Sequence, residues 1–293
     1  MLVTMKEIVD VADKEGYCVP APNYQHVMMM YKAVEAAEEA NSPLILDIGR
    51  HGLDAESRRK FIDLCSASRA AAEAASVPVC INLDHGGEYD LIVQCMFDGL
   101  TSVMVDRSYL SYEENVAQVA ELTKVAHALG ISVEAELGHV GNNVVEGVEN
   151  TGHNAAITSE EDKRKFYTNP DQAVDYVAAT GIDCLAVAVG TVHGAYPAGF
   201  EPSIDFELLA ELFEKVPVPL VLHGGSGTGD EILSKLGPYA SKLNVGTDLF
   251  RAWAEGVADA SAKGGDPAAE GTERYVAVLK HYMEVLGSAG KAE

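Results

Sequence analysis

The sequence lacks long hydrophobic runs and an excess of basic residues, and each absence excludes a class of partner. No apolar stretch approaches the roughly 20 residues that a membrane-spanning helix requires, so we expect no membrane partner. The chain has 21 Lys and Arg against 45 Asp and Glu, which leaves a formal net charge of −24. Such an acidic, solvated surface repels nucleic acid and anionic lipid. We therefore expect no nucleic-acid partner either.

The sequence also lacks paired-cysteine motifs and a targeting signal. Its five cysteines form no Cys-x-x-Cys motif, and four of them sit in apolar stretches, which predicts buried reduced thiols without a catalytic role. These cysteines are Cys18, Cys65, Cys80, Cys95 and Cys184. The first 17 residues follow an amphipathic pattern and lack the apolar core and cleavage site of a signal peptide. We expect a cytoplasmic protein.

Short apolar runs alternate with amphipathic helical patterns along the chain, and this alternation predicts the fold class. Helices are expected over 55–75, 113–129, 170–180 and 205–215. The expected strands are 17–23, 43–49, 77–84, 101–106, 132–137, 183–190, 218–224 and 242–246. Eight such units favour an α/β protein built as one (β/α)₈ TIM barrel over 1–293, with an open doubly wound sheet as the alternative. No GxGxxG motif follows the first strand, which disfavours a dinucleotide-binding sheet.

Helix-start signals and one long polar segment complete this outline. Ser111 with Glu114, and Thr228 with Glu231, fit capping boxes, and Asn169-Pro170 fits a cap followed by a first-turn proline. The polar segment at about 139–167 is far longer than a typical strand-to-helix loop, which predicts a mobile active-site lid.

Polar side chains interrupt the apolar strands near their carboxyl ends. They are Asp84, His85, Asp106, Glu134, Glu136, His193, His223 and Asn244. In a barrel these positions fall at the face where catalytic residues gather. A lone strand-end histidine is more often a hydrogen-bonded core residue, but three beside carboxylates favour a metal. Three imidazoles with an open fourth position are typical of catalytic zinc.

Two glycine-rich loops are suited to bind phosphate. HGGSGTGDE (223–231) and NVGTD (244–248) follow the seventh and eighth expected strands. Loops at these two positions commonly form the phosphate site of a barrel, because backbone N–H groups and helix dipoles can hold an anion there. A glycine-rich loop alone also serves a tight turn, so the evidence is that two such loops occur at the right pair of strands.

Motifs along nearly the whole chain resemble the class II fructose-bisphosphate/tagatose-bisphosphate aldolase family. They are LDHG (83–86), SVMVD with S-x-L-x-x-E-E-N (102–115), VEAELG (133–138), AVAVGTVHGAY (186–196), LHGGSGT (222–228) and KLNVGTDL (242–249). The resemblance implies a metal-dependent aldolase, a carbon–carbon lyase of carbohydrate metabolism. It further implies zinc, a phosphorylated sugar substrate, and a homo-oligomer (a dimer or tetramer).

The resemblance also assigns roles to residues. His85, His193 and His223 correspond to the catalytic metal ligands, and Asp106 and Glu136 to an alternative metal position. Asp84 takes the place of the catalytic acid/base. The phosphate-binding positions are Gly194, Gly224, Gly225, Ser226, Asn244, Val245, Gly246 and Thr247. A monovalent cation, Na⁺ or K⁺, is implied near the phosphate.

These roles agree with the chemistry of ketose phosphate cleavage through a zinc-stabilised dihydroxyacetone-phosphate enediolate. The reaction needs a base at the hydroxyl beside the breaking bond, which Asp84 can supply. The alternative role for Asp84 is to orient a histidine ligand. Glu134 and Glu136 share one strand face, so either could be the inward carboxylate, and only the motif favours Glu136.

The aldehyde side departs from the family pattern. Asn82 replaces a histidine, Gly49 a serine, and Pro197 a lysine, while Arg107-Ser108-Tyr109 replaces Gly-Ser-His. The lid does not align the family's glutamate, although Glu146 and Glu149 lie nearby. We hypothesise a different aldehyde partner, with Asn23, Arg50, Arg107 and Arg251 as possible distal contacts. The alternative is neutral drift, with another subunit supplying the distal phosphate contacts.

Two further functions fit the same pattern. One is a phosphosugar isomerase or epimerase that uses enediolate chemistry on the same scaffold. The other is a catalytically silent phosphosugar-binding protein, which the intact Asp84 and three intact histidines disfavour.

Overall fold

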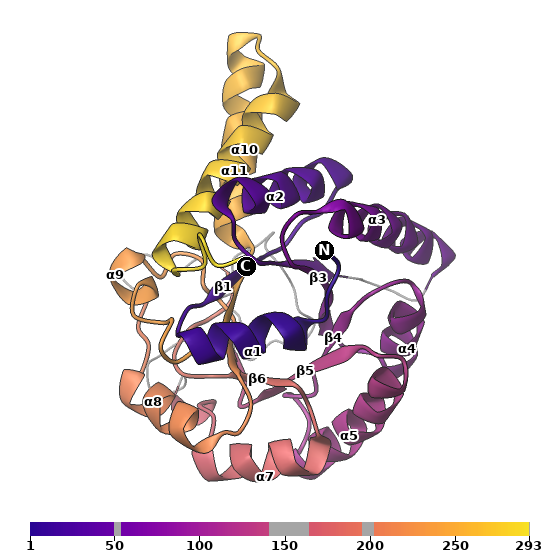
Figure 1. Ribbon diagram of the computed structural model, residues 1–293, viewed down its shortest axis with the longest axis vertical. Helices are drawn as coiled ribbons and strands as arrows, with labels where there is room; N and C mark the ends of the chain where they lie inside the picture. Colours follow the sequence, from indigo (N-terminus) through magenta and orange to yellow (C-terminus); the bar gives the residue numbers. More distant parts are fainter. Residues whose placement is uncertain (50–53, 141–163, 195–201, 293) are drawn as a thin grey trace.

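Eight parallel strands form the centre of the protein. The computed structural model describes residues 1–49, 54–140, 164–194 and 202–292. Hydrogen bonds join the strands in the order β1-β8-β7-β6-β5-β4-β3-β2, and a parallel bridge between Asn23 and Asp47 connects the β1 side to β2. The strands are β1 (Val19–Pro22), β2 (Leu44–Gly49), β3 (Val79–Gly86), β4 (Ser102–Val105), β5 (Ser132–Leu137), β6 (Cys184–Val187), β7 (Leu220–Leu222) and β8 (Lys242–Val245). The predicted (β/α)₈ barrel is confirmed (Figure 1).

Helices surround this barrel in the described parts of the chain (Figure 1). They are α1 (Met5–Glu15), α2 (Val27–Ala40), α3 (Ala55–Ala74), α4 (Tyr89–Phe97), α5 (Tyr112–Ala128), α7 (Pro170–Thr180), α8 (Phe206–Lys215), α9 (Asp230–Leu233), α10 (Thr247–Lys263) and α11 (Pro267–Val285). The four helices expected from periodicity correspond to α3, α5, α7 and α8. Ser111 and Glu114 form the predicted capping box of α5, and Asn169 caps α7 ahead of Pro170.

The capping box predicted for Thr228 and Glu231 is wrong. The short helix α9 begins at Asp230, and its N-cap is Gly229, which makes no side-chain capping bond. Gly229 has a φ of 83°, a left-handed conformation that glycine adopts without steric cost. This turn separates Thr228 from the helix, and the Thr228 side chain is buried instead of capping the first turn.

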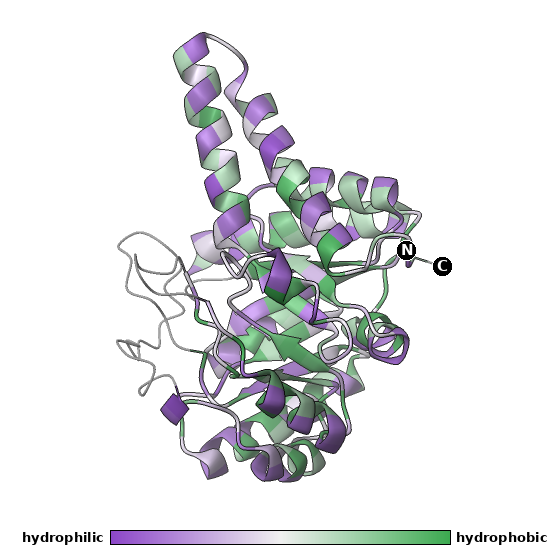
Figure 2. Ribbon diagram, turned by 90° about the vertical axis from the view of Figure 1, so that its left-hand side faces the viewer, coloured by the Kyte–Doolittle hydropathy of each residue, from purple (hydrophilic) through white to green (hydrophobic). Residues whose placement is uncertain are grey.

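Two hydrophobic layers stabilise the barrel. The larger lies between the outer faces of the strands and the surrounding helices, and Figure 2 shows apolar strands inside helices whose outer faces are polar. The second lies inside the barrel, where Met5, Ile8 and Val9 of α1 pack against interior residues such as Ile45 and Val221. Each fully buried aliphatic side chain of this kind contributes about 1.5–3 kcal/mol. Helix α1 therefore closes one end of the barrel.

Helices α10 and α11 form a hairpin that extends beyond the barrel (Figures 1 and 2). The two helices cross closely at Gly256 and Gly271. A Cβ atom at Gly256 would lie 2.7 Å from the backbone oxygen of Glu270, so only glycine permits this approach. Helix α10 therefore begins at the barrel rim and continues outward as the first helix of the hairpin.

Two expectations drawn from absences can be compared with this structure. All five cysteines are free and buried, as predicted. Among the described residues, no helix is both long enough and apolar enough to cross a membrane.

We predict that Ser111→Ala lowers the free energy of unfolding by about 1 kcal/mol, because the N-cap of α5 loses its side-chain acceptor. Urea denaturation measures this change. The control Ser111→Thr keeps the hydroxyl and should stay within about 0.5 kcal/mol of the parent protein. Equal stability of Ser111→Ala and the parent would contradict this role of the cap.

Candidate active site

A pocket opens at the carboxyl ends of the strands, where the sequence predicted the site. Its lining is drawn from the ends of β1, β3 and β8 and from the loops after β6 and β7. The lining residues are Asn23, Asp84, His193, Gly194, Gly224, Gly225, Ser226, Asn244, Gly246 and Thr247. Nine of them are predicted catalytic, metal or phosphate residues, and Asn23 is a predicted distal contact. The barrel therefore brings these separate motifs to one place.

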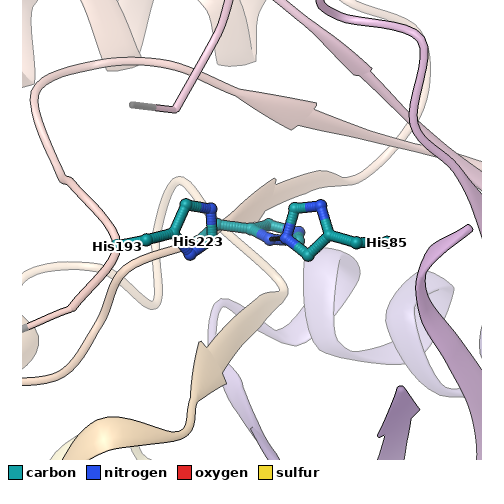
Figure 3. A group of neighbouring side chains, drawn as sticks. All are labelled: His85, His193 and His223. Atoms are coloured by element: carbon teal, nitrogen blue, oxygen red, sulfur yellow. Dashed lines mark hydrogen bonds between the residues drawn. The ribbon is translucent and has the colours of Figure 1, made fainter. Parts of the chain in front are cut away.

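The three predicted ligand histidines meet beside this pocket. The nitrogen atoms of His85, His193 and His223 that could hold a metal lie within 4.8 Å of one another. Figure 3 shows His85 and His193 approaching from opposite sides, with the ring of His223 between them. Their ring centroids are 4.8 to 5.6 Å apart and the rings are nearly perpendicular.

A backbone irregularity allows neighbouring residues of β3 to face the same site. In a regular strand, Asp84 and His85 would point to opposite faces of the sheet. The pairing of β3 with β4 shifts between Leu83 and Gly86, and His85 has a φ of 48°. Left-handed backbone is unusual for a residue other than glycine and is often found at functional sites. This bulge turns both side chains of the Asp84-His85 pair into the barrel mouth.

The polar atoms of the histidine cluster fit a metal ion. The His193 Nε2 atom is buried and has no hydrogen-bond partner among the described residues. His85 Nε2 and His223 Nδ1 lie 3.0 Å apart and face each other. Burial, followed by the charges of the other two histidines, lowers the pKa of His193 well below its usual value, which favours the neutral ligand form. Burial also lowers the pKa of His223, whereas the charges of Asp84 and Asp106 outweigh burial at His85 and raise its pKa to about 10. Three imidazoles are a donor set suited to zinc.

A second group of possible ligands lies next to the first. His85, Asp106 and Glu136 also place ligand atoms within 4.8 Å of one another. The Nδ1 atom of His85 lies 2.9 Å from Asp106 Oδ2, and Val140 N donates to Glu136 Oε1. Burial raises the pKa of Glu136 to about 8, and the negative charge of Asp106 acts in the same direction. A cation at this position would relieve that repulsion.

Both glutamates of β5 are buried, and they differ in depth within the barrel. Glu134 Oε1 lies 2.8 Å from His223 Nε2, and Lys242 donates to Glu134 Oε2 at 2.7 Å. Although burial raises its pKa, the charge of Lys242 and the bond to His223 hold the pKa of Glu134 at about 2. The sequence left open which glutamate faces inward. In the structure Glu136 lies beside His85 and Asp106, whereas Glu134 lies deeper in the barrel and contacts His223.

Asp84 is held by two amides. Asn23 Nδ2 donates to Asp84 Oδ2 at 2.8 Å, and Asn244 Nδ2 donates to Oδ1 at 3.0 Å. Burial alone raises the pKa of Asp84, but His85 and His223 outweigh it and lower the pKa below the usual value. The carboxylate therefore stays ionised and fixed at the pocket floor. The role of Asn23 in this arrangement was not apparent from the sequence, which had assigned it only to distal contacts.

The two glycine-rich loops lie side by side around the pocket. Gly225 N donates to the backbone oxygen of Asn244, and Gly227 N donates to Asp248 Oδ2. Gly224 has a φ of 69°, and a side chain there would overlap the backbone of Val192. Helix α10 begins at Thr247, so its N-terminal dipole points at the pocket. Val245 differs from the rest because its side chain is fully buried in the core.

Of the remaining predicted distal contacts, neither described arginine lines the pocket. Arg107 is 2% exposed and donates to Gln118 Oε1 and to the backbone oxygens of Gly86 and Asp106, which does not support a substrate contact. Arg251 forms an ion pair with Asp248 on the surface of α10. Arg50 lies outside the described residues, as do Pro197, Glu146 and Glu149.

The ends of the predicted lid are held together. His139 N donates to the backbone oxygen of Phe166, and Thr168 Oγ1 donates to that of Leu137. Most of the segment, residues 141–163, lies outside the described residues, so the lid stays a prediction.

Two buried polar groups were missed by the sequence reasoning. Lys242 and Asp47 are fully buried in the barrel interior, 3.4 Å apart. Their sequence signal was a lysine and an aspartate inside otherwise apolar strands, which could have indicated a buried ion pair. The sequence reasoning also missed a contact between Ser108 Oγ and His139 Nδ1, which lie 2.9 Å apart and link the ends of β4 and β5.

The chain is similar to known aldolases along its whole length. Residues 3–291 match the family described as fructose-bisphosphate aldolase class-II. The chain is 35% identical to the fructose-bisphosphate aldolase of Thermus caldophilus over 322 residues, which covers 100% of both chains. The crystal structure of the YdjI aldolase from Escherichia coli K12 has a TM-score of 0.84 and 30% identity, again covering 100% of both chains. The fold is shared with the Campylobacter jejuni fructose-bisphosphate aldolase, at a TM-score of 0.80 and 23% identity, over 99% of this chain and 97% of that one.

We predict that Arg107→Met lowers the free energy of unfolding by about 2–5 kcal/mol, because it leaves the buried backbone oxygens of Gly86 and Asp106, and the partly buried Gln118 Oε1, without their donor. The matched variant Arg251→Met removes an exposed ion pair and should cost no more than about 1 kcal/mol. Denaturant unfolding of both variants makes the comparison. Equal losses would mean that the two arginines do not differ in this way.

Proposed function

The chain belongs to the class-II fructose-bisphosphate aldolase family and is an aldolase, a carbon–carbon lyase, and from this premise we propose that it is metal-dependent and acts on a ketose phosphate. The observation that carries the proposal is the cluster of three histidines with the buried, unpartnered His193 Nε2 atom beside Asp84. His85, His193 and His223 would hold a zinc ion. Asp106 and Glu136 offer an alternative position with His85. When bound, zinc supplies Lewis acidity at the ketone oxygen of the substrate.

In this proposal Asp84 moves the proton. In the cleavage direction, its carboxylate takes the proton from the hydroxyl beside the breaking carbon–carbon bond, which leaves the aldehyde and the enediolate of dihydroxyacetone phosphate. In the synthetic direction it returns that proton. Asn23 and Asn244 each donate to one oxygen of Asp84, so the carboxylate is fixed in place before substrate arrives. A positioned acid/base group contributes about 10²–10⁴-fold to rate.

The phosphate on the ketone side would bind at the two glycine-rich loops. Ser226, Asn244 and Thr247 line the pocket together with glycines 194, 224, 225 and 246. No lysine or arginine is among these residues, so backbone N–H groups, a hydroxyl and the α10 dipole would hold the anion. The predicted monovalent cation fits the same need for positive charge.

We further propose that the aldehyde partner differs from the standard one. Asn82 stands where the family has histidine, and its amide donates at 2.8 Å to the buried Asp47. Tyr109 replaces a histidine and is partly exposed at the same end of the barrel. The ketone-side residues are retained in the pocket, whereas the positions that depart from the family concern the other half of the substrate.

We predict that Asp84→Ala lowers kcat by about 10²–10⁴-fold and leaves zinc content at one ion per chain, because the three histidines are untouched. Steady-state assays and metal analysis of the same preparation measure both. Asp63→Ala, on the exposed face of α3, serves as the control and should change neither. Activity of Asp84→Ala within a few fold of the parent, or parent activity that survives complete removal of metal, would contradict the proposal.

The altered aldehyde partner is tested by a substrate comparison. We expect weak cleavage of both fructose 1,6-bisphosphate and tagatose 1,6-bisphosphate, and faster condensation of dihydroxyacetone phosphate with another aldehyde from a screened panel. Measured kcat/KM values for the zinc-loaded enzyme decide the matter. Cleavage of either bisphosphate with a kcat/KM of about 10⁴ M⁻¹ s⁻¹ or more, within the ordinary range for enzymes, would overturn the altered-partner proposal.

A further inference from the structure

A buried group of charged side chains lies in the barrel below the histidine cluster. Lys242 of β8, Glu134 of β5 and Asp47 of β2 each have fully buried side chains. Lys242 Nζ is 2.7 Å from Glu134 Oε2 and 3.4 Å from Asp47 Oδ2. The amide of Asn82 on β3 holds the other Asp47 oxygen at 2.8 Å. Four strands thus contribute to one polar network inside an apolar barrel.

Two successive hydrogen bonds, through Glu134, connect Lys242 to His223, a predicted metal ligand. The ammonium group of Lys242 can only donate, so Glu134 Oε2 accepts its hydrogen bond. The other oxygen, Oε1, lies 2.8 Å from His223 Nε2. A carboxylate can only accept there, so His223 carries its proton on Nε2. The unprotonated Nδ1 atom then faces His85 and the position between the three rings.

We propose that Lys242 is a positioning residue, which acts through Glu134 to fix the tautomer and the ring orientation of His223. The inference rests on the proposed function, because it takes His223 to be a metal ligand. Lys242 touches neither the metal nor the substrate in this arrangement. Its effect is to present the Nδ1 lone pair of His223 to the ion.

Stability alone is a weak reason for such a network. Taking an ammonium and two carboxylates out of water is costly, and apolar side chains of similar volume often stabilise a protein interior as well or better. The interior residues around it, such as Ile45 and Cys80, are apolar. A role in orienting His223 accounts for charges at this depth and for the direction of each hydrogen bond.

The test measures metal affinity in addition to activity. Lys242→Met keeps the length of the side chain and removes its charge, and Glu134→Gln removes the negative charge while keeping an oxygen. We expect each to weaken Zn²⁺ binding by about 10–100-fold, the usual cost of losing a group that orients a ligand. Competition with a chromogenic chelator measures this affinity. Lys235→Met, on an exposed lysine paired with Glu231, is the matched control and should bind Zn²⁺ as the parent does.

A double variant keeps the test decisive if Lys242→Met does not fold. Lys242→Met/Glu134→Gln leaves fewer unpaired charges in the interior. Because both residues act along one path, its loss of Zn²⁺ affinity should be similar to the larger single loss. A loss equal to the product of the single losses would overturn the proposal, as would affinities within two-fold of the parent for the folded variants.

A spectroscopic measurement separates positioning from a general loss of stability. Co²⁺ bound in place of Zn²⁺ should show a changed visible absorption spectrum in Lys242→Met, and Lys242→Arg should restore the parent spectrum at least in part. An unchanged spectrum in Lys242→Met would overturn the proposal. If the parent itself binds no Zn²⁺ at the three histidines, the proposed function fails. If the parent binds and the variants match it, only this inference fails.

Discussion

The hydrogen bond between His223 Nε2 and Glu134 Oε1 is the interaction on which the geometry of the site depends. It fixes the one fully buried histidine of the cluster, against which the other two rings are packed nearly perpendicularly. A buried imidazole without this acceptor could adopt either tautomer, and the ring nitrogen that faces the pocket would then be undefined. The bulge in β3 completes the arrangement, because it turns both Asp84 and His85 toward this fixed ring.

The charge of the protein explains how its pocket is built. A formal net charge of −24 opposes the approach of an anion, and the described residues that line the pocket include no lysine or arginine. Oriented dipoles are available there instead: two glycine-rich loops joined by a backbone hydrogen bond, and the start of α10. Such donors cost little reorganisation, and they bring no mobile cationic side chain near the buried carboxylates.

The sequence predicted the barrel, and it picked out the residues that gather at the pocket, because both depend on local patterns. Apolar strand runs and their alternation with helices predicted the fold class, and strand-end histidines predicted the histidine cluster. Contacts between distant strands were not predictable in the same way. Lys242 meets Glu134 across 108 positions of the chain, and Arg107 turns into the protein and away from the pocket. The cap expected at Thr228 failed because a left-handed glycine set the turn. The first two depend on which way a single side chain points, and the third on the backbone conformation of one glycine.

Helix α1 limits how molecules can enter and leave the barrel. Because Met5, Ile8 and Val9 close the opposite end with apolar side chains, the barrel axis is not a passage. Everything that enters the pocket must leave by the mouth through which it came. For a reaction that divides one molecule into two, we expect a single opening to set the order of release, in which the fragment nearer the mouth leaves first and the fragment seated deeper leaves after it.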